Sequence, residues 1–212
     1  MNCPVYCFRR SKYNKNDLWI GGDKFSYYSY KDDRIYNIGT ANNEIDNLSE
    51  IHAICETSDT TLWVSSQGLW HIVLDKKTTP YKIKRKEQQF FLRDGNNTND
   101  VFYSMLQNSD STLILGSRKG YGAIQYNIRN KQYHYININN ANNKGLGDII
   151  SMYAKGDSIL YMGASTGLTQ VQIHEGKENI VKQFGRKNGI VNDMIHGVLE
   201  DSDGIIWLST SK

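Results

Sequence analysis

The sequence contains few of the residues that define several common protein classes. Its 212 residues include only two prolines and three cysteines, and no apolar run approaches the ~18 residues of a membrane-spanning helix. The proline and glycine contents exclude a collagen-like or proline-rich disordered chain. Cys3, Cys7 and Cys55 are too few for a disulfide framework or a four-ligand zinc site, and Met1 to Pro4 open no signal-peptide pattern.

Neither sign of charge is in large excess. Lysine and arginine number 25 against 22 acidic residues, a formal net charge of +3. A dedicated nucleic-acid-binding protein usually carries a dominant basic face. Nucleic acid is therefore not an expected partner.

Aromatic and amide residues are abundant. The chain has 14 tyrosines, four tryptophans and 21 asparagines. Tyrosine and tryptophan favour strands, whereas asparagine favours turns. This composition predicts an all-β protein with many short loops.

An internal repeat is the strongest pattern. Five similar segments recur with their second residues spaced by 44, 51, 47 and 46 positions. They are Leu18-Trp19-Ile20-Gly21-Gly22, Leu62-Trp63-Val64-Ser65-Ser66, Leu113-Ile114-Leu115-Gly116-Ser117, Leu160-Tyr161-Met162-Gly163-Ala164 and Ile206-Trp207-Leu208-Ser209-Thr210. The repeats span approximately 1–48, 49–99, 100–147, 148–191 and 192–212, the last being truncated.

Two further positions recur in register with these segments. An aspartate stands four residues before the anchor at Asp59, Asp110, Asp157 and Asp203. A small residue stands ten before it at Ala53, Ser104, Ser151 and Gly197. The first repeat has Lys15 and Arg9 at these positions, so its leading part is expected to be degenerate or truncated.

Each repeat is expected to contain four strands. In the fourth they are predicted at 148–154, 159–163, 168–174 and 179–184, separated by polar turns. Four strands in a period near 46 residues are typical of a propeller blade. The prediction is an all-β fold, a β-propeller made of four-stranded blades, as an incomplete segment of about four to five blades of a larger propeller.

Residues that suggest chemistry mostly have a structural interpretation. The aspartates of the recurrent turn accept backbone N–H bonds in hairpins, and Trp19, Trp63 and Trp207 are expected to pack between blades. The five histidines are scattered, so no metal site is predicted. No catalytic or cofactor-binding motif is present, and Asp94, Asp148 and Asp193 show no context that marks a catalytic pair. We therefore expect no catalytic residues and no cofactor.

The loops after the second and fourth strands are longer and richer in polar groups than the tight turns. Strands alternate in direction, so these loops lie at the same end of each blade. The candidate ligand-binding residues there are Arg93, Asn97, Arg118, Tyr121 and Arg186, whose groups could hydrogen-bond to and stack on sugars. The alternative is that asparagine-rich loops are simply good turns.

The last repeat, from Asn188-Gly189-Ile190-Val191 through Glu200-Asp201-Ser202-Asp203-Gly204 to Ile206-Trp207-Leu208-Ser209-Thr210, resembles the two-component regulator propeller repeat. Gly68-Leu69 and Gly167-Leu168 match the pair that opens the family's third strand, whereas Ile114 and Tyr161 replace its tryptophan. The resemblance implies a non-enzymatic, extracytoplasmic or periplasmic sensor propeller of a hybrid histidine kinase. It further implies an oligosaccharide ligand, as in Bacteroidetes, and partners in the kinase region and further blades of the same protein.

Other function classes stay open from the residues alone. One is a carbohydrate-active enzyme, a lyase or glycosidase, on a propeller scaffold, because fold does not determine function. Another is a protein-interaction platform. Apolar residues such as Ile195, Val198 and Trp207 would be exposed in an open array, so self-association, for example as a homodimer, is also expected.

Overall fold

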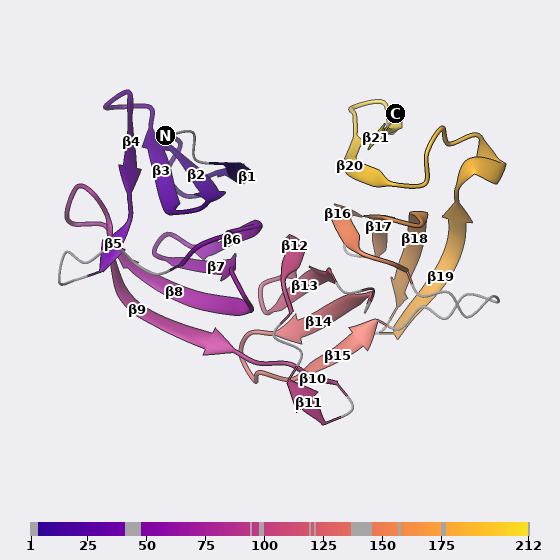
Figure 1. Ribbon diagram of the computed structural model, residues 1–212, viewed down its shortest axis with the longest axis horizontal. Helices are drawn as coiled ribbons and strands as arrows, with labels where there is room; N and C mark the ends of the chain where they lie inside the picture. The colour runs from indigo at the N-terminus through magenta and orange to yellow at the C-terminus, as the bar shows by residue number, and fades with distance from the viewer. Residues whose placement is uncertain are drawn as a thin grey trace. The chain divides into compact units, whose positions relative to one another are not determined.

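The computed structural model describes residues 4–40, 48–93, 95–97, 100–118, 120, 122–136, 146–156, 158–174 and 177–211. Over these residues the fold is all-β, built of antiparallel sheets whose strands, apart from the short strand β5, follow one another in chain order (Figure 1). One short 3-10 helix, η1 (Arg186–Asn188), is the sole helix of the described part. The predicted all-β propeller built from four-stranded blades is confirmed.

The first two blades are complete four-stranded sheets. Blade 1 consists of β1 (Val5–Arg10), β2 (Asp17–Gly22), β3 (Phe25–Ser29) and β4 (Arg34–Asn37). Blade 2 consists of β6 (Ala53–Ser58), β7 (Thr61–Ser65), β8 (Leu69–Asp75) and β9 (Lys82–Gln89). The short strand β5 (Gly39–Thr40) pairs in parallel with β9 and extends this sheet to five strands.

Two more four-stranded blades and two hairpins follow. Blade 3 consists of β12 (Phe102–Ser109), β13 (Thr112–Ser117), β14 (Ala123–Asn127) and β15 (Tyr133–Ile136), and the hairpin β10 (Leu92–Arg93) and β11 (Asn96–Asn97) precedes it. Blade 4 consists of β16 (Ile149–Lys155), β17 (Ile159–Ala164), β18 (Gly167–His174) and β19 (Lys177–Phe184). The hairpin of β20 (Ile195–Glu200) and β21 (Ile206–Thr210) comes last. The four strands of blade 4 lie within three residues of their predicted bounds.

The chain forms two compact units, residues 1–102 and 103–212, each with its own core. In the first, Trp19, Tyr27, Ile51 and Leu62 are almost fully buried between blades 1 and 2. In the second, Ile114, Ile149, Met162 and Val171 fill the space between blades 3 and 4. Each core therefore consists of side chains from the facing surfaces of neighbouring sheets.

Neighbouring blades approach closely at a glycine in the second strand. A Cβ atom on Gly21 would lie 2.6 Å from Cγ2 of Ile51, the residue that leads into blade 2. The equivalent Cβ on Gly116 would lie 2.8 Å from Cγ2 of Ile149. Real Cβ atoms do not come this close to another carbon, so glycine is required for the blades to pack at this distance.

The expectation that the first repeat is degenerate is wrong, because β1–β4 form a complete blade. Cys7 pairs with Gly21 as Ser151 pairs with Gly163, which makes the first hairpin of blade 1 two residues longer. Cys7, not Arg9, therefore occupies the small-residue position. Its Sγ donates to the carbonyl of Ile51 at 3.6 Å, and Ser104 Oγ donates to the carbonyl of Ile149 at 3.2 Å in blade 3.

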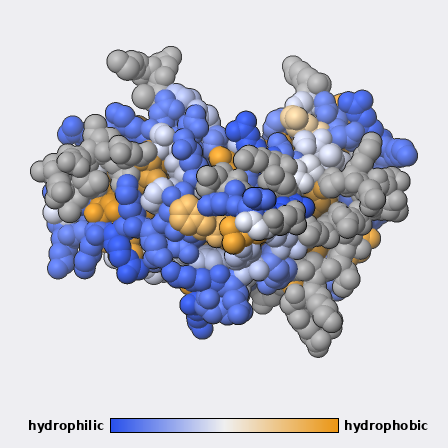
Figure 2. Space-filling model, turned by 60° about the horizontal axis from the view of Figure 1, so that its bottom comes forward, coloured by the Kyte–Doolittle hydropathy of each residue, from blue (hydrophilic) through white to orange (hydrophobic). Residues whose placement is uncertain are grey.

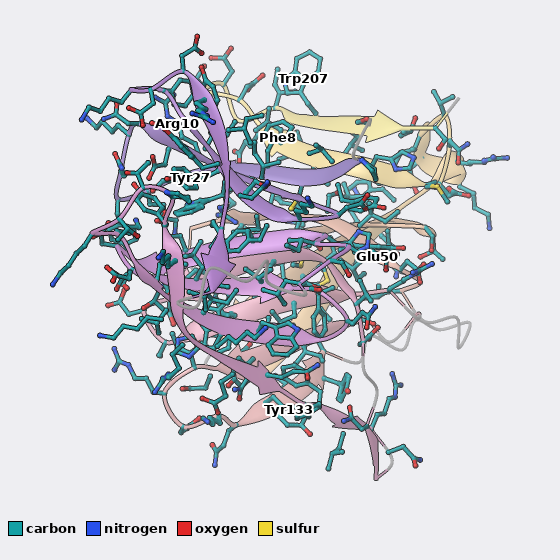
Figure 3. All side chains as sticks on the ribbon, turned by 60° about the vertical axis from the view of Figure 1, so that its left-hand side comes forward. Phe8, Arg10, Tyr27, Glu50, Tyr133 and Trp207 are labelled. Atoms are coloured by element: carbon teal, nitrogen blue, oxygen red, sulfur yellow. The ribbon has the colours of Figure 1, made fainter. Side chains whose placement is uncertain are left out.

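The repeated tryptophans differ in their surroundings. Trp19 and Trp63 are 0% and 3% exposed, which agrees with packing between blades. Trp207 is 59% exposed, and its Nε1 donates to Asp201 Oδ2 at 2.6 Å. Among the residues coloured in Figure 2, hydrophilic ones predominate and the apolar ones form small patches. Phe8 and Trp207, both labelled in Figure 3, are among the large apolar residues that are exposed.

Candidate functional site

Each blade has two chemically different ends. We call the end that carries the loops after the second and fourth strands the loop end, and the end that carries the other two turns the turn end. In blade 4 the loop end includes Ser165, Thr166 and the segment 185–194, which contains η1. The turn end of that blade lies between β16 and β17 and between β18 and β19.

An aspartate before the first strand of a blade holds a loop of the preceding blade. Asp193 Oδ1 accepts the backbone N–H of Arg186 at 2.9 Å, and Asp193 Oδ2 lies 3.8 Å from Arg186 Nε. In the same way, Asp148 Oδ1 accepts the backbone N–H of Gly120 at 3.1 Å. These carboxylates therefore position the loops that carry Arg186 and Arg118. The two aspartates therefore anchor these loops, a role that their neighbours in the sequence did not indicate.

A cavity of about 370 Å³ lies at the loop end of blade 4. Its walls include Thr166, Gln183, Phe184, Arg186 and Lys187. The side chain of Arg186 is 66% exposed, so it is accessible to a ligand. Amide, guanidinium, ammonium and aromatic groups around one cavity can hydrogen-bond to and stack on a polar cyclic ligand.

Part of this polar lining is already used to shape the loop. Asn188 Oδ1 accepts the backbone N–H of Gly185 at 3.1 Å, and Thr166 Oγ1 donates to the carbonyl of Leu146 at 2.6 Å. The ammonium group of Lys182 lies over the ring of Phe184 at 4.7 Å. The groups left for a ligand are therefore mainly those of Gln183, Arg186 and Lys187.

The predicted residues fall into separate places. Arg186 lines the cavity of blade 4, whereas Arg118 is exposed at the loop end of blade 3 with its guanidinium 5.5 Å from the ring centroid of Tyr103. Tyr121 lies outside the described residues, as do the loop residues 41–47 and 140–144. Within the second unit, the structure thus describes two of the three candidates.

Arg93 and Asn97 lie in the first unit, on the β10–β11 hairpin. Asn97 pairs with Leu92, and Arg93 pairs with Asn96. Asn97 is exposed and Arg93 is half-buried. The two candidates therefore share one hairpin, but their side chains point to opposite faces of it.

Several residues of the cavity were not among the candidates predicted from the sequence. Gln183 and Phe184 belong to the last strand of blade 4 and not to a loop. The polar character of that strand could have indicated these residues. A polar and an aromatic side chain at the end of a strand can line a binding site just as loop side chains can. No group of three metal-ligating side chains occurs among the described residues.

The chain is similar to known propellers. The model of the two-component regulator propeller family matches residues 189–212, the repeat in which the sequence predicted this resemblance. A comparison with curated proteins found no match.

Solved structures match nearly the whole chain. The extracellular domain of BT3049, described as a hybrid two component system from B. thetaiotaomicron, is 17% identical with a TM-score of 0.69, over 99% of this chain and 26% of that one. The corresponding domain of BT4673 from the same organism is 20% identical with a TM-score of 0.66, over 92% and 25%. Virginiamycin B lyase from Staphylococcus aureus is 14% identical with a TM-score of 0.64, over 97% and 62%.

These similarities establish the fold. The chain spans about a quarter of the length of the two B. thetaiotaomicron domains. Across the residues that the structure describes, no helix has the length and apolar character needed to cross a membrane.

Proposed function

We propose that this chain is the ligand-sensing propeller segment of a two-component signalling receptor. It detects an oligosaccharide outside the cytoplasm, in the periplasm, and passes the signal to a histidine kinase region of the same full-length protein. The segment itself is not an enzyme. Its partners are the oligosaccharide and further blades of the same protein.

The observation that carries this proposal is the match of residues 189–212 to the two-component regulator propeller family. The similarity of almost the whole chain to the extracellular domains of two hybrid two component systems supports it. The chain's small share of those domains fits a segment that acts together with other parts of a longer receptor.

The loop-end cavity supports a sugar as the ligand. Gln183 offers an amide, Arg186 and Lys187 offer cationic donors, and Phe184 offers an aromatic surface in the same cavity. Sugars present many hydroxyl groups that such side chains bind by directed hydrogen bonds. The two cationic residues outnumber Asp193, the acidic residue in the same lining, and would favour an oligosaccharide that carries an acidic group.

The test is a transcriptional reporter in a bacterium that carries the complete gene, exposed in turn to neutral and acidic oligosaccharides. A sensor gives a sugar-dependent response that disappears when residues 1–212 are deleted. Arg186→Ala should shift the response to higher sugar concentration, whereas Arg85→Ala, at an exposed arginine of β9 distant in sequence from this cavity, should not. A response that persists after the deletion would refute the proposal.

The similarity to virginiamycin B lyase favours one alternative, an enzyme on the propeller scaffold. The loop-anchoring hydrogen bonds of Asp148 and Asp193 argue against either aspartate as a catalytic acid. Incubation of the purified chain with the same oligosaccharides, followed by chromatography, separates the two functions. Cleavage products would establish the enzyme, and intact sugar is expected from a sensor.

A further inference from the structure

Neighbouring sheets meet through a recurring pair of residues, which we call the plug and the socket. The plug lies two positions before the recurrent small residue and is fully buried in four cases: Ile51, Phe102, Ile149 and Ile195. The socket lies two positions after the second residue of the repeated segment (the anchor) and is buried in the same four cases: Gly21, Ser65, Gly116 and Gly163. Each glycine socket lies against the isoleucine plug of the next sheet. Ser65 Oγ instead accepts the backbone N–H of Phe102 at 2.8 Å. Each of these plugs is therefore matched to one socket.

Blade 1 carries a plug that meets no socket in the described part of the chain. Cys7 is the small residue of this blade, so its plug is Val5, at the start of β1. Val5 is 58% exposed, in contrast to the four buried plugs. Phe8 occupies the position that Ile54 has in blade 2, and it is 73% exposed whereas Ile54 is buried. The face of blade 1 that carries Val5 and Phe8 is therefore open.

The β20–β21 hairpin carries the opposite feature, a socket that holds no plug among the described residues. Ser209 stands two positions after the anchor Trp207, and it is exposed. Trp207 pairs with Leu199 across the two strands, and both side chains are exposed on the face that Ser209 shares. Ile205, two positions before Trp207, adds a further exposed apolar side chain. Exposed apolar side chains gathered on one face mark an interaction surface.

A polar pair joins neighbouring sheets near the turn end at two places. One partner stands three positions after the small residue of the following sheet, and the other stands four positions after the small residue of the preceding sheet. Glu56 accepts the hydroxyl of Ser11 in this way between blades 1 and 2. Glu200 pairs in the same way with Lys155 between blade 4 and the hairpin. These two positions therefore form a second point of contact beside the plug and the socket.

The two open faces carry opposite charges at these positions. Blade 1 has Arg10, whose guanidinium is always protonated and lies over the ring of Tyr30 at 5.6 Å. The hairpin has Asp201, whose carboxylate accepts the indole N–H of Trp207 and the backbone N–H of Ile205. These hydrogen bonds lower the pKa of Asp201, so its carboxylate is ionised at neutral pH. The open faces are therefore complementary in charge as well as in plug and socket.

We propose that a second copy of this chain docks onto these faces, with its Val5 plug in the Ser209 socket of the first copy. The backbone N–H of the plug donates to the serine hydroxyl, as the plug of blade 3 does to its own socket, and Arg10 pairs with Asp201. Each contact takes a different face from each copy, so the copies associate head to tail, and a dimer keeps one open plug and one open socket. A further blade of the same protein would occupy the same faces and compete with the second copy. The inference does not depend on the proposed receptor role.

The test measures the mass of the purified chain by sedimentation velocity at concentrations from about 1 to 500 µM. The mass of the unmodified chain should rise with concentration. Val5→Lys and Ser209→Lys place a charged side chain at the plug and at the socket, and each should weaken association by about thirtyfold or more. Val181→Lys is the matched control, because it changes a similarly exposed valine of β19 that belongs to neither face, and it should associate as the unmodified chain does.

An equimolar mixture of the Val5→Lys and Ser209→Lys chains separates head-to-tail association from a symmetric dimer in which each face meets its own copy. The first chain keeps an intact socket and the second an intact plug, so the mixture should form a dimer and nothing larger. Both substitutions introduce lysine, so the altered residues cannot pair with each other, and recovered association also shows that each variant is folded. The proposal is overturned if the unmodified chain stays monomeric over the whole range, if either variant associates as the unmodified chain does, or if the mixture stays monomeric.

Discussion

Gly163 in β17 lies directly against Ile195, the first residue of β20. A Cβ atom on Gly163 would be 2.7 Å from Cγ2 of Ile195 and 2.5 Å from Oγ of Ser151. Ile195 is fully buried at this contact. Gly21 with Ile51 and Gly116 with Ile149 repeat the relationship, so a contact between a glycine and an isoleucine limits how closely the sheets approach at these three places.

Gly163→Ala should therefore destabilise the chain. The added methyl group has no space, and overpacking of this kind costs about 1–3 kcal/mol of the free energy of unfolding. Gly197→Ala is the matched control, because the nearest atom to its added Cβ would be Cβ of Ser209 at 3.5 Å, an ordinary contact. Urea unfolding of both variants checks the prediction, and equal stabilities would contradict it.

Glu56→Ala should be strongly destabilising. The Glu56 carboxylate is 1% exposed, and it accepts the hydroxyl of Ser11 at 2.9 Å and the backbone N–H of Lys12 at 2.7 Å. Lys76 Nζ lies 3.8 Å away. Removal of the carboxylate leaves these donors without an acceptor, which should lower the free energy of unfolding by about 3 kcal/mol. Asp59→Ala, which removes the exposed partner of Lys76, should cost at most about 1 kcal/mol.

Stability should depend on pH through Asp17. This carboxyl is 2% exposed, and burial raises its pKa above the usual 3.8, although Tyr81 and Asn14 donate to it and Lys76 lies nearby. The folded state therefore binds this proton more tightly than the unfolded state. The stabilisation from that proton is fully present below pH 3.8 and is lost as the pH rises through the raised pKa.

Asp17→Asn should remove this part of the pH dependence. The free energy of unfolding of the unmodified chain should fall relative to that of the variant as the pH rises from about 3.8. Chemical denaturation at a series of pH values measures the difference. A difference that does not change with pH would show that the carboxyl is not perturbed.

The thiol of Cys7 should be unreactive in the folded chain. Burial raises its pKa to about 12, and the thiolate is the nucleophilic form. In a Cys3→Ser background, iodoacetamide at neutral pH should label Cys7 only after denaturation. Cys7→Ser should fold normally, because Ser104 makes the equivalent hydrogen bond in blade 3. Rapid labelling under native conditions would contradict the raised pKa of this partly buried thiol.

The loop-end candidates lead to a binding prediction. Arg118→Ala and Arg186→Ala, in the complete receptor, should each weaken binding of an oligosaccharide that activates the reporter by about 1–3 kcal/mol if they contact it. The sequence predicts the same for Tyr121→Ala. Calorimetry measures the affinities, and the thermal stability of each variant should stay unchanged. Undiminished binding in all three variants would place the site elsewhere.

The sequence by itself determined the blades. Strand pairing within a blade joins neighbours in the chain through short turns, so alternating side chains and turn residues identify it locally. For this reason the strands of blade 4 were predicted within three residues. The recurrence of Gly21, Gly116 and Gly163 could be recognised in the sequence for the same reason. Their contacts with isoleucines of the next sheet, which leave no room for a larger residue, could not.

Tertiary structure decided what depends on contacts between blades. The assignment of blade 1 failed because Cys7, and not Arg9, occupies the small-residue position. There its Sγ donates to the carbonyl of Ile51, which leads into blade 2. The roles of Asp148 and Asp193 were equally hidden, because each binds a loop of the preceding blade. Such contacts join residues distant in the chain, and their geometry depends on how sheets pack, which the local pattern of a strand does not contain.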